Sequence, residues 1–81
     1  MEYQHKPLTR EVLDQAKAVI SANFKNVKME EIGEEGSLKL IVTSDEPKGN
    51  DFLPFHNLRQ KHNFRALMEP LGEGRSRLTL G

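Results

Sequence analysis

Apolar residues recur every three or four positions in the first quarter of the chain. This spacing is typical of one face of an α-helix, and the positions between are charged or polar. Thr9 has a side chain suited to an N-cap, and Leu8 and Leu13 stand where a hydrophobic staple would place them. We therefore predict a core-forming helix from the Thr9 cap to about Phe24, with apolar positions Val12, Leu13, Ala16, Val19, Ile20 and Phe24.

The pattern then changes to alternation with period two. Apolar residues alternate with charged or polar ones on both sides of the glycine-bounded turn at 33–36, at Val27, Met29, Leu38, Leu40 and Val42. This alternation predicts a β-hairpin with one buried face. Residues 43–51 concentrate Pro, Gly, Asn and Asp, so we expect them to form a loop.

The second half repeats this order. We expect a helix over about 52–62, with Asn50 or Asp51 as the cap, Pro54 in the first turn, and one apolar stripe at Phe52, Phe55 and Leu58. Alternation returns after Asn63, with Phe64, Ala66 and Met68 on one face and Arg65, Leu67 and Glu69 on the other. A turn at 70–74 leads to a last strand, in which Ser76, Leu78 and Leu80 point inward and Arg75, Arg77 and Thr79 outward.

These elements predict an α+β fold of order αββαββ. In the two-layer sandwich that satisfies the apolar stripes, two helices cover one face of a mostly antiparallel four-stranded sheet. Residues 1–7 are expected to form a flexible N-terminal arm and residues 8–81 a single domain, because 81 residues suffice for only one core. The two halves repeat loosely, since EEIGEEGSLKL is similar to MEPLGEGRSRL.

Charge is balanced overall and uneven along the chain. Twelve basic residues face twelve acidic ones, but residues 1–50 contain seven against nine, and residues 51–81 five against three. The second half thus carries a weak positive charge. The absence of cysteine excludes disulfides and thiolate zinc sites and fits a reducing, intracellular location, cytoplasmic or nuclear. No apolar run is long enough to span a membrane, and the polar N-terminus does not resemble a secretion signal.

The sequence contains no pattern typical of an active site. His56 and His62 are six residues apart and do not share a helix face as two metal ligands would. The Gly72-Glu73-Gly74 turn precedes a strand, whereas a phosphate-binding glycine loop precedes a helix. No serine or aspartate has the spacing of a nucleophile and its base. We expect no enzyme activity, no metal and no cofactor.

The segment FHNLRQKHNFR at 55–65, followed by GEGRSRL at 72–78, resembles the end of the Arg-x-x-x-His ("R-three-H") domain. Members of that family are small α/β modules that bind single-stranded nucleic acid. The resemblance implies that His56 is the signature histidine and that Arg75 and Arg77 are the basic residues after the turn. Phe52 stands at the position of the signature arginine.

The resulting expectation is a non-catalytic module that binds single-stranded RNA or DNA weakly and in a salt-dependent manner. Its contacts would come from a basic face of the second helix and the last strand, at His56, Arg59, Lys61, Arg65, Arg75 and Arg77. The alternative is a protein-interaction or homodimerisation module that uses the acidic segments 30–35 and 45–46 with Ile41 or Leu67. A third interpretation is that the arginines only solvate an open sheet face.

Overall fold

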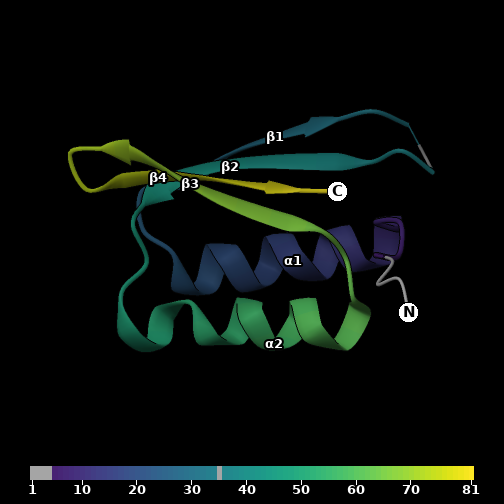
Figure 1. The fold of residues 1–81 in the computed structure, drawn as a ribbon, viewed down its shortest axis with the longest axis horizontal. Helices are drawn as coiled ribbons and strands as arrows, with labels where there is room; N and C mark the ends of the chain where they lie inside the picture. Colours follow the sequence, from purple (N-terminus) through teal and green to yellow (C-terminus); the bar gives the residue numbers. More distant parts are fainter. Residues whose placement is uncertain (1–4, 35) are drawn as a thin grey trace.

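The structure is a computed structural model that describes residues 5–34 and 36–81 (Figure 1). Both helices lie side by side on one face of a four-stranded antiparallel sheet and run in opposite directions. The predicted fold class and the order αββαββ are therefore confirmed. The elements are α1 (Arg10–Asn23), β1 (Lys28–Ile32), β2 (Lys39–Asp45), the 3-10 helix η1 (Gly49–Asp51), α2 (Leu53–His62), β3 (Ala66–Gly72) and β4 (Arg75–Leu80).

Helix α1 begins where its cap predicts. The Thr9 hydroxyl accepts a hydrogen bond from the Val12 N–H at 3.2 Å, which satisfies one of the donors that a helix start leaves unpaired. Leu8 and Leu13 are both buried. The helix ends at Asn23, one residue before the predicted limit, and Phe24 continues in extended backbone into the core.

Helix α2 begins differently from the prediction. The residue at its N-cap is Phe52, and no side chain caps the helix, so the prediction that Asn50 or Asp51 would do so is wrong. Both residues lie in η1, where the backbone N–H of Asp51 donates to Lys48. The chain thus enters α2 directly from a 3-10 turn, with Phe52 at the boundary between the two helices.

The sheet has the strand order β1-β2-β4-β3. Strand β2 extends to Asp45, so the predicted loop starts three residues too early: Thr43, Ser44 and Asp45 pair with Arg77, Ser76 and Arg75 of β4. Likewise β3 extends to Gly72, and the turn before β4 consists of Glu73 and Gly74, both with positive φ as in the tight turns that join hairpin strands. In both places, pairing with β4 overrides the local preference of polar, Pro and Gly residues for loops.

The sheet has an approximate two-fold symmetry that relates the two αββ halves. The strand order supports this: β2 and β4 are antiparallel neighbours at the centre, with Ile41 opposite Thr79, and β1 and β3 pair antiparallel on their outer sides. The two-fold rotation that exchanges the halves therefore places β2 on β4 and β4 on β2. The weak sequence repeat matches this structural repeat at Leu40 and Leu78 of the central strands, and is shifted by one residue between β1 and β3.

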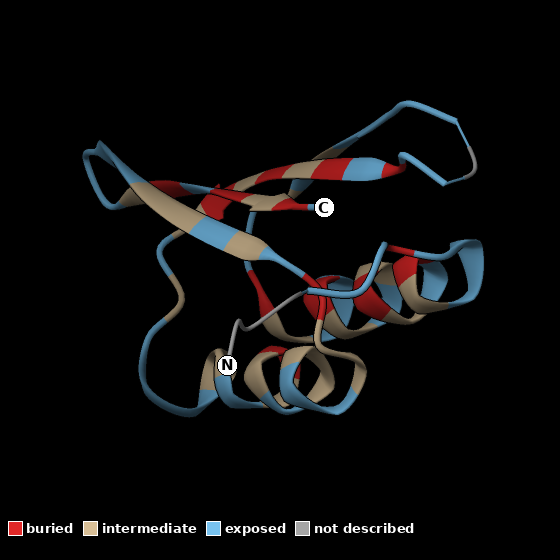
Figure 2. Ribbon diagram, turned by 45° about the vertical axis from the view of Figure 1, so that its right-hand side comes forward, coloured by how far each residue is buried: buried red, intermediate tan, exposed pale blue. Residues whose placement is uncertain are grey.

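The core lies between the helices and the inner face of the sheet (Figure 2). Ser76, Leu78 and Leu80 are buried as predicted, so Arg75, Arg77 and Thr79 belong to the outer face. Phe55 and Phe64 are also buried and pack edge to face with their ring centroids 5.9 Å apart. The rings of Phe55 and Phe64 are therefore part of the hydrophobic core.

The predicted N-terminal arm is described only in part. Residues 1–4 of the arm and Glu35 of the first hairpin turn lie outside the described residues. The Lys6 N–H donates to the Asn63 carbonyl at 2.8 Å, and Leu8 is buried. Residues 6–8 are thereby attached to the domain at the C-terminal end of α2.

Candidate interaction surfaces

The six basic residues predicted to bind nucleic acid lie on separate parts of the molecule. Arg75 and Arg77 project from the outer face of the sheet, opposite to the helices. His56 and Arg59 lie on α2 and line a pocket together with Ala66 and Met68 of β3 and Leu78 of β4. Lys61 is exposed in the last turn of α2, and Arg65 is exposed between α2 and β3. The structure does not bring the helix and the last strand together as one basic face.

Both arginines of β4 form ion pairs on the outer sheet face. Arg75 donates to Asp45 at 2.8 Å and to the Asn26 carbonyl at 3.0 Å. Arg77 lies 3.4 Å from each carboxylate oxygen of Glu69, its cross-strand neighbour. The hydrogen bond from Arg75, assisted by one from Asn26, holds the pKa of Asp45 below its ordinary value. These partners offset the positive charge that the sequence suggested for the last strand.

Arg65 instead belongs to a basic pocket at the end of the sheet where the first hairpin turns. The pocket has a volume of about 390 Å³ and includes His5, Lys6, Lys39 and Arg65. None of the side chains lining this described pocket is acidic. Lys39 and Arg65 flank Gly81, whose N–H donates to the Arg65 carbonyl at 2.9 Å. Sequence reasoning included Arg65 but could not join it to Lys39, which is 26 positions away.

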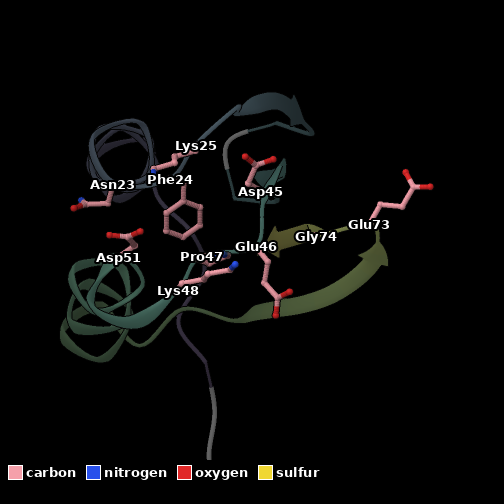
Figure 3. A pocket seen from close by; sticks show the side chains of 10 residues that line it. All are labelled: Asn23, Phe24, Lys25, Asp45, Glu46, Pro47, Lys48, Asp51, Glu73 and Gly74. Carbon is pink, nitrogen blue, oxygen red and sulfur yellow. The ribbon is translucent and has the colours of Figure 1, made fainter.

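Another pocket, with a volume of about 420 Å³, lies at the opposite end of the domain (Figure 3). Its carboxylates come from β2 and its following loop, from η1 and from the β3–β4 turn, where Glu73 projects away from the other side chains. Two lysines, Lys25 and Lys48, offset part of this negative charge. Among residues 5–34 and 36–81, no group of three or more His, Cys, Asp or Glu side chains is placed to hold a metal ion.

A third region, which we name the β3 groove, runs between α2 and β3, which is one of the two edge strands of the sheet. It consists of two pockets of about 340 and 160 Å³ that share Phe52 and Met68. The larger one also includes Pro70 and Ser76, and the smaller one His56 and Arg59. The other lining residues are Glu46, Pro47, Phe55, Ala66 and Leu78. The groove thus combines an apolar end with a basic end.

Among the described residues, the backbone of β3 pairs only with β4. Arg65 and Gly81 are joined by a backbone hydrogen bond, and bonded pairs alternate along an antiparallel ladder. The N–H and C=O groups of Ala66 and Met68, and the C=O of Pro70, therefore point away from β4. Pro70 has no N–H to offer on that side, which makes it compatible with an edge strand.

Three polar groups in the β3 groove have no ion-pair or hydrogen-bond partner in the described part of the chain, although the His56 ring packs beside the Phe52 ring. The Arg59 guanidinium and the His56 ring form no ion pair or side-chain hydrogen bond there. The Ser76 hydroxyl is buried without a hydrogen bond, in a residue that is only 2% exposed. An unpaired buried hydroxyl is costly, so Ser76 would gain from a ligand partner, and the half-buried side chains of Arg59 and His56 are open to a ligand.

The opposite edge of the sheet, β1, is protected in a way that β3 is not. Glu31 of β1 pairs with Leu40, and Met68 of β3 pairs with Leu78, so the two-fold symmetry makes Glu31 and Met68 equivalent. Glu31 forms ion pairs with Lys17 and, at 2.7 Å, with Arg10 of α1. The hydrogen bond from Lys17 is the main reason that the pKa of Glu31 is lowered. An inward charge of this kind discourages edge-to-edge pairing.

No family model, curated protein or solved structure matches this chain. In the described residues, neither helix has the length and hydropathy needed to cross a bilayer.

Proposed function

We propose that this domain is a protein-interaction module that binds an extended segment of a partner chain along β3. The observation that carries the proposal is the contrast between the two sheet edges. Strand β3 presents unpaired backbone groups above an apolar groove, whereas the β1 edge has the Glu31 ion pairs. In binding by strand addition, backbone hydrogen bonds supply affinity and pockets for alternate side chains supply specificity.

The geometry of the β3 groove suits this mode of binding. An added strand would exchange backbone hydrogen bonds with Ala66 and Met68 and donate one to the Pro70 carbonyl. Every second side chain of the strand would then point toward the helix layer, where Phe52 and Met68 offer apolar contact. Pairing would end at Pro70, so the paired part of the partner chain would be short, about five residues.

An NMR titration with a short peptide tests this proposal. The probe is an end-blocked Thr-Val-Thr-Val-Thr-Val-Thr peptide, titrated into the ¹⁵N-labelled protein while backbone amide shifts are recorded. We expect the shifts to concentrate at Ala66 and Met68.

A substitution in β3 tests the edge itself. Ala66→Pro removes one outward N–H without removing a bond to β4, and should weaken binding about tenfold. The matched control is Met29→Pro, which makes the equivalent change on the β1 edge and should leave binding intact. Shifts centred on β1, or binding insensitive to Ala66→Pro, would rule out the proposed edge.

A second candidate function is binding of single-stranded RNA or DNA, and the basic pocket favours it. Lys6, Lys39 and Arg65 converge there without an acidic side chain, as phosphate contacts require. The core position of Phe55 and Phe64 removes them as stacking surfaces, so affinity would be low and electrostatic.

Fluorescence anisotropy with labelled single-stranded RNA, single-stranded DNA and duplex, each at two salt concentrations, tests the second candidate. We expect Lys39→Glu with Arg65→Glu to abolish binding of the single strands. The pair Arg75→Glu with Arg77→Glu should have a smaller effect, because both arginines already have carboxylate partners. Absence of binding at low salt would exclude this function.

A further inference from the structure

We infer that the segment bound at β3 carries an acidic side chain two residues away from an apolar one, and that Arg59 and His56 bind its carboxylate. This inference rests on the proposed function and adds the chemistry of the partner to it. The spacing follows from strand geometry, because only residues two apart point to the same face.

The apolar part of the inference comes from the larger pocket of the β3 groove. Phe52, Met68 and Pro70 line it, and its volume of about 340 Å³ accommodates a branched aliphatic side chain. Burial of such a side chain contributes to affinity in proportion to the apolar area removed from water. Ser76 lines the same pocket, and its buried hydroxyl has no hydrogen-bond partner in the described residues.

The acidic part comes from the smaller pocket. Arg59 and His56 lie there beside Ala66 and Met68, with no carboxylate among the side chains that line it. Arg59 supplies a planar set of donors that matches a carboxylate, and the imidazole of His56 can supply one more. A partner carboxylate would thus satisfy donors that the domain leaves unpaired.

The other half of the domain already contains an arrangement of this kind. Glu31 on β1 is bound by Arg10 and Lys17, two basic side chains of the helix beneath that strand. In the β3 half, the helix provides the basic side chains and the equivalent strand position is Met68. Among the described residues, none of the side chains that line the pocket beside Arg59 and His56 is a carboxylate, and we assign that role to the bound segment.

The two ends of the groove define the direction of the segment. Arg59 lies toward the start of β3, whereas Pro70 and the acidic Glu46 lie toward its end. Every pair in this sheet is antiparallel, and antiparallel ladders are slightly more stable than parallel ones. An antiparallel segment would therefore have the order apolar, any residue, acidic.

The test uses fluorescein-labelled peptides and the intact 81-residue chain. The probe is end-blocked Ser-Thr-Val-Thr-Glu-Thr-Ser, compared with the same peptide containing glutamine in place of glutamate and with a peptide in which Val and Glu are exchanged. We expect the first peptide to bind about tenfold more tightly than the glutamine peptide, as for a hydrogen bond to a charged group. The exchanged peptide should also bind more weakly.

The variant Arg59→Gln tests whether Arg59 binds the carboxylate of the peptide's glutamate. It retains helix propensity and much of the side-chain length, and should abolish the difference between the glutamate and glutamine peptides while leaving the glutamine peptide's affinity unchanged. Lys61→Gln, on the same helix and outside the groove, is the matched control and should preserve the difference.

The outcomes separate the two levels of the proposal. If both peptides shift the β3 amides with equal affinity, the acidic preference is overturned and strand addition at β3 stands. If neither peptide shifts these amides, the proposed function itself fails. If Lys61→Gln rather than Arg59→Gln abolishes the difference, the assignment of the carboxylate to Arg59 is wrong. Equal or tighter binding of the exchanged peptide would overturn the antiparallel direction.

Discussion

The Arg75 guanidinium of β4 donates to the Asp45 carboxylate of β2 across the central strand pair, at 2.8 Å. This hydrogen bond is the main reason that the pKa of Asp45 lies below its ordinary value of 3.8. The native state therefore favours the charged carboxylate. Its contribution to stability is fully present above pH 3.8 and is lost as the pH falls through the lower native pKa.

Asp45→Asn should consequently destabilise the domain at pH 7, and the difference from the unmodified protein should shrink as the pH falls below about 4. Urea unfolding at several pH values between 3 and 7 measures this difference. Asp14→Asn is the matched control, because Asp14 is exposed on α1 and forms no ion pair in the described residues. A pH-independent effect of Asp45→Asn would contradict the role assigned to its charge.

The sequence predicted those features that depend on local periodicity. Alternation placed Leu78 and Leu80 in the core and Arg77 outside it, and Thr9 identified the start of α1. The prediction that Asn50 or Asp51 caps the second helix was wrong, because the 3-10 turn found there has no periodic pattern that marks it in the sequence.

The candidate surfaces depended on long-range pairing and were therefore predicted less well. The Arg75–Asp45 contact joins residues 30 positions apart and requires that β2 extend beyond Val42. The separation of Arg59 from Arg77 follows from the predicted alternation of β4 and the predicted helix layer taken together, and the expectation of one basic face did not combine the two. The β3 groove likewise joins η1, α2 and two strands, so no contiguous motif marks it.

Glu31 should protect the β1 edge from self-association. Glu31→Met places at this edge the residue found at the equivalent position of β3, and removes the ion pairs with Arg10 and Lys17. We expect this variant to associate with itself as its concentration rises, because an uncharged edge strand can pair with another chain. Sedimentation velocity at increasing concentration measures the effect. Glu30→Met, on the outer face of the same strand, is the control, and equal association of both variants would show that added hydrophobicity alone is responsible.

Thr9 should contribute to stability through its hydroxyl group. Thr9→Ala removes the acceptor for the Val12 N–H and should lower the free energy of unfolding by about 1 kcal/mol. Thr9→Ser retains the acceptor and should cost much less. Urea unfolding of the two variants distinguishes the lost cap from a lost methyl contact, since only the cap hypothesis predicts a large difference between them.

Phe55 should be among the most sensitive core positions. Its side chain is fully buried and contacts the rings of Phe24, Phe52 and Phe64. Phe55→Ala should cost about 3 to 5 kcal/mol, a large part of the stability expected for a domain of this size. Leu53→Ala, two residues earlier at a site that is 50% exposed, should cost far less. Thermal unfolding of the two variants provides the comparison, and similar melting temperatures would contradict the placement of Phe55 in the core.

Ser44 and Ser76 pair directly across the two central strands β2 and β4, yet they should respond in opposite ways to the same change. The Ser44 hydroxyl donates to the Asp45 carbonyl at 3.0 Å, whereas the Ser76 hydroxyl is buried without a partner in the described residues. Ser44→Ala should therefore lower the free energy of unfolding by about 1 kcal/mol. Ser76→Ala removes an unsatisfied group and should raise it by a similar amount, about 1 kcal/mol. Urea unfolding of both variants measures the two signs. A loss of stability in Ser76→Ala would mean that its hydroxyl has a partner in solution, and would remove one of the three unpaired polar groups assigned to the β3 groove.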